Sequence, residues 1–144
     1  MIRELQAQDL DGLLRLYTFL HDDPMPDRSS TIDALWQEIL DDTRHHIIGA
    51  WQGGQLISSC VCVVVPNLTH AQRPYALIEN VVTDPAYRRQ GFATACLEAA
   101  CRIAQSAGCY KVMLLTGSKR ESTLRFYEKA GFNRNDKTAF IRWL

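Results

Sequence analysis

The residues best suited to chemistry lie in one stretch, ENVVTDPAYRRQGFATA, which runs from Glu79 to Ala95. Arg88 and Arg89 precede Gly91, where a helix is predicted to begin. A helix start leaves about four backbone N–H groups without acceptors and carries about half a unit of positive charge. Glycine lets a ligand approach the main chain, and guanidinium groups match phosphate oxygens. The stretch predicts a pyrophosphate site, and a plain helix cap beside two solvated arginines is the alternative.

This predicted phosphate loop differs from two common kinds. A Walker A loop requires the pattern GxxxxGK[ST], which does not occur in the chain. A dinucleotide-binding loop requires GxGxxG, whereas Gly91 is followed by Phe92 and Ala93. Both loops are therefore excluded.

Three motifs resemble those of the GNAT acetyltransferase superfamily. RRQGFA, residues 88–93, fits the family signature [QR]-x-x-G-x-[GA] between a strand and a helix. FYEKAGF, residues 126–132, is similar to a second family element, and GCYKV, residues 108–112, is similar to the matching strand of glucosamine-6-phosphate N-acetyltransferases. The resemblance covers residues 75–132, and the N-terminal half matches only in the order of its elements.

The resemblance implies that acetyl-CoA is the cosubstrate. It implies that two central parallel strands separate and that backbone groups of Val81, Val82 and Thr83 pair with the pantetheine arm. It also implies that amides around the pyrophosphate come from Arg88, Arg89, Gln90, Gly91, Phe92, Ala93 and Thr94. Many relatives have Asn near the start of the last helix, where this chain has Arg120, so a side-chain amide contact to CoA is not expected there.

Glu79 is the candidate general base for removing a proton from the amine that attacks the thioester. It is an acid in a strand of apolar residues, where burial of an unpaired charge is costly and makes a carboxylate a stronger base. Alternation places Leu77, Glu79 and Val81 on one face of that strand. Glucosamine-6-phosphate acetyltransferases are similar here, because they have an acidic residue at the matching position. The alternative is a structural ion pair with an arginine or a lysine.

Tyr127 is the candidate acid, because it falls on the family tyrosine whose hydroxyl faces the CoA sulfur. A phenol with a pKa of about 10 suits protonation of a thiolate. We assign the neighbouring Phe126 to the core and Tyr127 to the site, with simple packing of Tyr127 as the alternative. The oxyanion donor would be a backbone N–H of the strand at Val81 or Val82.

The sequence indicates the cosubstrate more clearly than it indicates the acceptor, for which there are two candidate regions. In this fold the acceptor lies near the loop after the first helix, here residues 21–30, whose acids would attract a cationic amine. A solvated loop is the alternative. His70 and Arg73 are a second candidate, for an acceptor anion. The adjacent His45 and His46 lack a third ligand nearby in the sequence, which argues against a metal site.

The expected elements follow from periodicity and turn signals. Strands are predicted at 1–5, 46–51, 56–65, 75–83, 109–115 and 138–144. Helices are predicted at 9–20, 31–41 and 91–106, with a last one from a Ser118–Glu121 capping box to residue 130. The order β-α-α-β-β-β-α-β-α-β predicts an α/β fold, one domain over residues 1–144 with a central mixed sheet and helices on both faces.

The composition limits which classes of partner and which cellular locations are expected. Sixteen basic and sixteen acidic residues cancel, which argues against nucleic-acid binding. No apolar run approaches the length of about 20 residues that spans a membrane, and the N-terminus lacks a signal-peptide segment, so a cytosolic location is expected. Five cysteines without a CxxC pair argue against a disulfide or metal framework, and Cys60 and Cys62 are predicted to be buried apolar residues.

These observations lead to one main functional hypothesis. The chain is identified as an acetyl-CoA-dependent N-acetyltransferase that modifies a small primary amine by direct transfer in a ternary complex. An amino sugar is one variant of the acceptor, and a protein or peptide amine is another. A CoA-binding regulatory module without turnover is the alternative from a different class. The resemblance also implies a homodimer.

Overall fold

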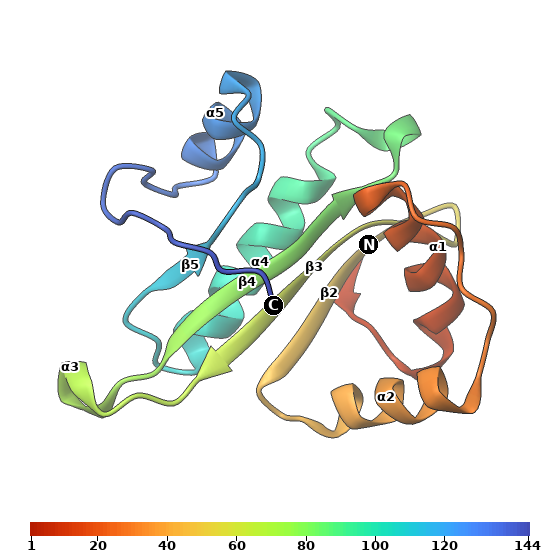
Figure 1. Cartoon of the computed structure of the whole chain (residues 1–144), viewed down its shortest axis with the longest axis horizontal. Helices are drawn as coiled ribbons and strands as arrows, with labels where there is room; N and C mark the ends of the chain where they lie inside the picture. The colour runs from red at the N-terminus through yellow and green to blue at the C-terminus, as the bar shows by residue number, and fades with distance from the viewer.

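The computed structural model describes all 144 residues and contains a five-stranded mixed sheet between helices (Figure 1). The strands follow one another across the sheet in chain order, so each pairs with its sequence neighbour. The pairs from β1 to β4 are antiparallel, and β4 and β5 are parallel. The strands are β1 (Ile2–Glu4), β2 (His45–Gln52), β3 (Gln55–Val65), β4 (Tyr75–Thr83) and β5 (Val112–Leu114).

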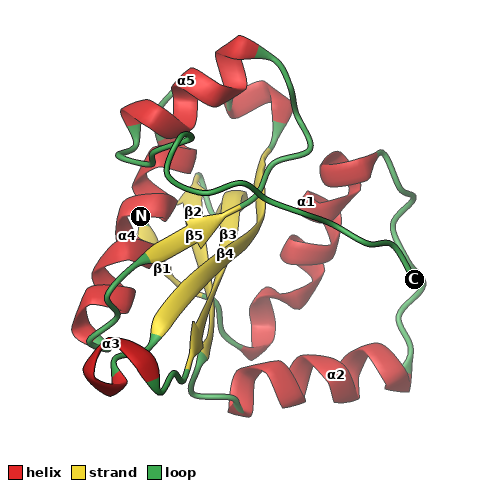
Figure 2. Cartoon of the chain, turned by 60° about the vertical axis from the view of Figure 1, so that its left-hand side comes forward, coloured by secondary structure: helices red, strands yellow, loops and turns green.

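The helices cover both faces of the sheet, as predicted (Figure 2). Helices α1 (Leu10–His21) and α2 (Ser30–Asp41) lie on one face, and α4 (Phe92–Ser106) lies on the other. The short helices are α3 (Thr69–Gln72) and the 3-10 turns η1 (Ala7–Asp9) and η2 (Pro85–Tyr87), and α5 (Glu121–Lys129) follows β5. None of the helices has the length and apolar character that crossing a bilayer needs.

Each face of the sheet has its own hydrophobic core. On the α1/α2 face the buried Leu16 and Trp36 belong to one cluster, and the Trp36 indole donates a hydrogen bond of 3.1 Å to the Ala7 carbonyl. On the α4 face Cys60 and Cys62 are fully buried, which confirms their prediction as small apolar residues. Burial raises the pKa of both thiols. The molecule therefore has two separate cores, divided by the sheet.

Strand β4 contains a β-bulge at its middle. Val61 of β3 pairs with Glu79 and Ser59 pairs with Val82, so Asn80 and Val81 stand opposite a single residue of β3. Asn80 takes a left-handed backbone conformation with φ of 51°. An extra residue of this kind reverses the alternation of side chains beyond it. The inserted residue decides which side chains of β4 reach each face.

Strand β5, which pairs with the edge of β4 opposite β3, is much shorter than predicted. Strand β5 covers three residues in place of the predicted 109–115 and pairs only with Ala76, Leu77 and Ile78. Beyond Ile78 the two parallel strands have no ladder between them. The edge of β4 from Glu79 to Thr83 is therefore open on the side of β5.

Two predicted features near the C-terminus are wrong. The segment 138–144 forms no strand, and its large apolar side chains stay exposed because no sheet edge receives them. The predicted capping box is also absent, since α5 begins at Glu121 with Arg120 as its N-cap. Ser118 instead accepts a hydrogen bond from the Arg120 amide in the preceding turn. The elements otherwise agree with prediction to within a few residues.

Candidate functional site

The predicted phosphate loop forms a tight connection between β4 and α4. The Asp84 carboxylate accepts a hydrogen bond from the Ala86 amide and caps η2. Gly91 is the N-cap of α4 and has φ of 86°, a left-handed conformation that favours glycine. Apart from Gly91 and its two chain neighbours, no residue has an atom within 4 Å of the position that a Cβ on Gly91 would occupy. The main chain at Gly91 is therefore open to a ligand.

The amides that follow Gly91 have no acceptor within the helix. The first hydrogen bond of α4 runs from the Ala95 amide to the Gly91 carbonyl at 3.0 Å, which leaves the amides of residues 92–94 free. Arg89 and Gln90 are exposed, and Arg89 has a left-handed φ of 63°. These residues fit an anion, because main-chain donors, a helix N-terminus and exposed guanidinium groups occur together.

The open edge of β4 leads directly into this loop. Val81, Val82 and Thr83 are on that edge, and the Arg88 side chain donates to the Thr83 carbonyl at 3.2 Å. On the other edge the Ser58 hydroxyl lies 2.8 Å from the Thr83 hydroxyl and donates to the Val82 carbonyl at 3.0 Å. The strand is thus held on one side and free on the other, so an extended chain could pair with it.

An ion pair that the sequence did not reveal holds the loop to α1. The Arg15 guanidinium lies 3.0 Å from the buried Asp84 carboxylate and also donates to the Leu56 carbonyl at 2.7 Å. Burial alone would raise the pKa of Asp84. The hydrogen bonds from Arg15 and from the Ala86 amide outweigh burial and lower that pKa below its ordinary value. This pair fixes the turn that precedes the phosphate loop.

Tyr127 lies on α5 against the core of the α4 face. Its ring meets Phe126 and Phe132 edge to face, with centroids 4.9 and 6.4 Å away. Val81 packs against the same core cluster, so α5 brings Tyr127 to the side of the sheet that Val81 faces. Burial raises the pKa of Tyr127, and the nearby Cys60 thiol adds to the effect. The hydroxyl is therefore neutral and able to donate a proton or a hydrogen bond.

Glu79 is exposed, so the burial expected for it is wrong. It makes no ion pair either, which leaves the structural alternative without support. The prediction that Glu79 and Val81 share a face is also wrong, because the bulge at Asn80 turns Val81 to the α4 face. Glu79 alternates with the buried Ile78 and lies on the α1/α2 face. Glu79 therefore lies on the α1/α2 face of the sheet, whereas Tyr127 packs on the α4 face.

A pocket of about 310 Å³ lies on the α1/α2 face beside the bulge. Asn80 forms part of its wall, together with Tyr17 of α1 and His45 at the start of β2. Burial raises the pKa of Tyr17 to about 12, although the nearby Asn80 side chain partly offsets this effect. The sequence contains one signal for this site: Glu79 and Asn80 are two consecutive polar residues in an otherwise apolar strand, which indicates a bulge.

The loop between α1 and α2 borders this pocket through Pro26. Its aspartates at positions 22, 23 and 27 are exposed, as expected for an acidic loop. The two histidines after α2 have different surroundings. His45 lines the pocket, and the His46 ring lies 2.9 Å from the Glu4 carboxylate. The structure thus brings the predicted acceptor loop and the bulge of β4 to one pocket.

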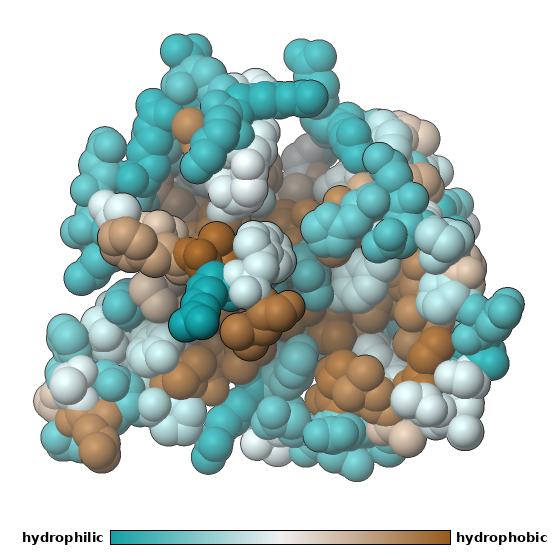
Figure 3. Space-filling model, viewed as in Figure 1, coloured by the Kyte–Doolittle hydropathy of each residue, from teal (hydrophilic) through white to brown (hydrophobic).

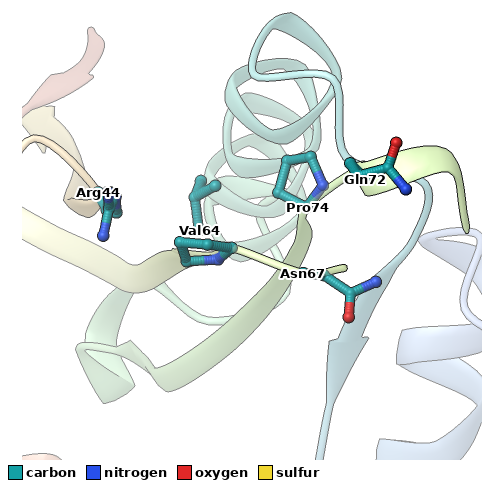
Figure 4. A pocket seen from close by; sticks show the side chains of 6 residues that line it. Arg44, Val64, Asn67, Gln72 and Pro74 are labelled. Carbon is teal, nitrogen blue, oxygen red and sulfur yellow. The ribbon is translucent and has the colours of Figure 1, made fainter. Parts of the chain in front are cut away.

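The second predicted acceptor region is used for internal contacts. Arg73 donates to the carbonyls of Gly108 and Cys109 at 3.1 Å each, and the His70 ring stacks on Tyr110 with centroids 3.8 Å apart. A cavity of about 260 Å³ lies near the start of β4 (Figure 4), with Arg44 as the only charged residue in its lining. This end of the sheet contains neither predicted catalytic residue.

Comparisons with known proteins agree with the geometry. The acetyltransferase (GNAT) family model matches residues 11–132. A solved structure from Agrobacterium tumefaciens str. C58 is 38% identical, covers 99% of each chain and has a TM-score of 0.91. A glucosamine 6-phosphate N-acetyltransferase from Trypanosoma brucei brucei is 38% identical over 84 residues, which is 58% of this chain and 55% of that protein. The match thus spans about half of that relative. Glucosamine-6-phosphate N-acetyltransferase from Arabidopsis thaliana shares the fold, with a TM-score of 0.88 at 22% identity over 99% of this chain and 97% of that one.

Proposed function

This chain belongs to the acetyltransferase (GNAT) family, and from that premise we propose that it is an acetyl-CoA-dependent N-acetyltransferase acting on a primary amine of a small molecule. The observation that carries the proposal is the open edge of β4, which leads into a loop of free amides at Gly91. An edge that ends at an anion site fits a ligand with an extended amide-bearing arm and a pyrophosphate. We propose that residues 1–144 act together as one such domain.

The proposed binding mode uses main-chain groups for most contacts. Val81, Val82 and Thr83 would pair with the pantetheine arm, and amides from Arg88 to Thr94 would surround the pyrophosphate. The exposed side chains of Arg88 and Arg89 add positive charge at the same place. Arg120 is the N-cap of α5 and carries a guanidinium in place of a side-chain amide, so no amide contact to CoA is proposed from that position.

The proposed reaction is direct transfer in a ternary complex. The amine nitrogen attacks the thioester carbonyl, a C–N bond forms, and the C–S bond breaks. A backbone N–H at the bulge, of Val81 or Val82, donates to the oxyanion. The Tyr127 hydroxyl gives its proton to the departing thiolate. Glu79, which is exposed, takes the amine proton through a water molecule.

The role of Glu79 is tested by Glu79→Gln, with Glu98→Gln on the exposed side of α4 as the matched control. Loss of a positioned base should lower kcat by about tenfold or more and flatten its dependence on pH. The acetyl-CoA dissociation constant from calorimetry should stay the same. An unchanged pH–rate profile would remove Glu79 from the base role while leaving the acetyl-CoA site in place.

Release of CoA thiol with a panel of amines separates the proposed function from its alternatives. Turnover with free amines supports a small-molecule acceptor, and turnover with peptides alone supports a protein acceptor. Tight acetyl-CoA binding without turnover on any amine would identify a regulatory module. The absence of any calorimetric signal with acetyl-CoA would overturn the enzyme assignment itself.

A homodimer is part of the proposal and is supported by the C-terminal segment, residues 138–144. The exposed fractions of Phe140, Ile141 and Trp143 are 91%, 67% and 85%, which is a large apolar surface for so short a segment (Figure 3). A second copy of the chain would cover these side chains. A cytosolic location is also proposed, because all five cysteines are free thiols, which persist in a reducing compartment.

A further inference from the structure

The pocket beside the bulge has an apolar wall. Ten of its 13 lining residues are hydrophobic, and its volume is about 310 Å³. Trp36 and Leu35 of α2 and Leu14 of α1 contribute to this wall, and Leu35 is 55% exposed at its rim. Figure 3 shows hydrophobic residues at the surface over α1 and α2. A cavity of this size and composition is typical of a small-molecule site.

The pocket lies where an acceptor must be placed for transfer at the bulge. Asn80 is both the inserted residue of β4 and part of the wall. Tyr17 and Asn80 both line the pocket, so the Tyr17 hydroxyl and the Asn80 amide make this part of the wall polar. A ligand whose amine points at Asn80 would leave its remaining atoms against Trp36 and Leu35.

The charges around the pocket favour a cation over an anion. No lysine or arginine lines it, and the adjacent loop contributes three exposed aspartates, at positions 22, 23 and 27. The nearest arginine of that loop, Arg28, is already paired with Asp11 and Asp33. A phosphate group placed in the pocket would lose its hydration without gaining a cationic partner, which is costly.

We infer that the acceptor is a primary amine with an apolar body, such as an arylalkylamine, in preference to a phosphorylated amino sugar. This inference rests on the proposed acetyltransferase function and specifies its substrate class. The ammonium group is attracted by the acidic loop, and the apolar body fills the space against Trp36 and Leu35. The polar wall at Tyr17 and Asn80 orients the nitrogen toward the open edge of β4.

The first experiment compares two acceptors at saturating acetyl-CoA, with release of CoA thiol as the measurement. The value of kcat/KM for 2-phenylethylamine should exceed that for glucosamine 6-phosphate by about tenfold or more, because an apolar group in a fitting pocket gives discrimination of this order. A preference for glucosamine 6-phosphate would overturn the inference and leave the proposed function intact.

The second experiment introduces a cation at the rim with Leu35→Arg. The matched control is Leu68→Arg, at a residue that is 86% exposed and outside the pocket. Leu35→Arg should lower kcat/KM for 2-phenylethylamine by about tenfold, with an unchanged KM for acetyl-CoA. Leu68→Arg should change neither value. Equal activity of the two variants on the amine would overturn the inference.

A binding measurement tests the pocket without turnover. Trp36 lines the pocket, so 2-phenylethylamine should change the tryptophan fluorescence of the wild-type chain in a saturable manner. Trp36→Phe should abolish the change, and Leu35→Arg should shift it to higher amine concentration. The absence of a saturable change would overturn the inference even if acetyl-CoA binds. A saturable change without acetyl-CoA binding would support the pocket and contradict the proposed function.

Discussion

The two halves of the candidate site are built from different parts of the chain. The half that would hold acetyl-CoA consists of main-chain groups, namely the open edge of β4 and the free amides after Gly91. The half that would hold the acceptor consists of side chains from α1, α2 and β4, including Tyr17, Trp36 and Asn80. Main-chain groups are the same in every sequence, whereas side chains define a particular pocket.

This difference explains why the short motifs that resemble the family lie in the acetyl-CoA half, although the family model matches residues 11–132 and covers both halves. Free amides require only a strand, a tight turn and a glycine, so a short motif identifies them. The acceptor pocket requires helices distant in sequence to meet at the bulge of Asn80. The acetyl-CoA half therefore indicates a reaction class, and the half made of side chains would determine the acceptor.

The largest expected effect comes from Tyr127 of α5, whose hydroxyl would face the thioester sulfur at the acetyl-CoA half. Tyr127→Phe should lower kcat by about tenfold to a thousandfold, because the thiolate would lose its proton donor. The matched control is Tyr110→Phe, which removes a phenol hydroxyl from the ring that stacks on His70. Steady-state kinetics and acetyl-CoA calorimetry would measure both variants. Similar kcat values for Tyr127→Phe and the wild type would assign Tyr127 to packing alone.

The next effect concerns the ion pair that joins the two halves. Asp84→Asn should destabilise the fold by about 1–3 kcal/mol, because the partly buried Arg15 would lose its carboxylate. Urea denaturation at neutral pH would measure this change. Glu121→Gln is the control, since Glu121 pairs with Arg125 and Arg134 at the exposed surface. A larger loss for the control would contradict the assignment of Asp84 as the anchor.

The pH dependence of this pair has a definite sign. The pKa of Asp84 is lowered in the folded chain. Its contribution to stability is therefore complete above the ordinary carboxyl pKa of about 4 and is lost as the pH falls through the lowered value. The difference in stability between wild type and Asp84→Asn should shrink in acid below about pH 4.

Gly91→Ala should weaken acetyl-CoA binding by about tenfold, because a left-handed conformation costs a residue with Cβ about 1–2 kcal/mol and the loop would shift to relieve it. Gly54→Ala is the matched control, since Gly54 has a φ of 79° in the β2–β3 turn. Both variants should lose similar thermal stability, and only the first should lose affinity in calorimetry. Equal affinities would show that the phosphate loop tolerates a side chain.

The smallest expected effect on catalysis comes from the C-terminal segment. Removal of residues 138–144 should convert a dimer to a monomer in light scattering and change kcat less than twofold or so, about the scatter of surface changes. The double variant Phe140→Asp, Ile141→Asp retains the chain length and should have the same effect on mass. A wild-type mass equal to one chain would contradict the proposed homodimer.

The sequence predicted most of the fold because its elements carry local signals. The small residues of α4, the glycines after it and the apolar run of β4 each indicate their own structure. Residues 138–144 include Phe140, Ile141 and Trp143, which favour strands, yet no neighbouring edge receives them. The Ser118–Glu121 pattern failed for a related reason, since the turn before α5 uses the Ser118 hydroxyl elsewhere. A strand or a cap forms only if its partner is in place.

The prediction for Glu79 failed because alternation along a strand assumes a regular strand. The bulge at Asn80 places Val81 on the α4 face, away from Glu79, and Glu79 stays exposed. The roles of Glu79 and Tyr127 remain predictions that kinetics must test. The ion pair of Arg15 with Asp84 joins residues that are 69 positions apart, so no local pattern indicates it.

The amino-acid sequence by itself determined the order of elements up to α5, the glycine turn that begins α4 at Gly91 and the family that these motifs resemble. Each of these depends on residues close together in the chain, where backbone sterics and hydrogen bonding act locally. The tertiary structure alone decided the opening between β4 and β5, the face on which Glu79 lies and the apolar lining of the pocket beside the bulge. These depend on strand register and on contacts between distant segments, which only the packed chain defines.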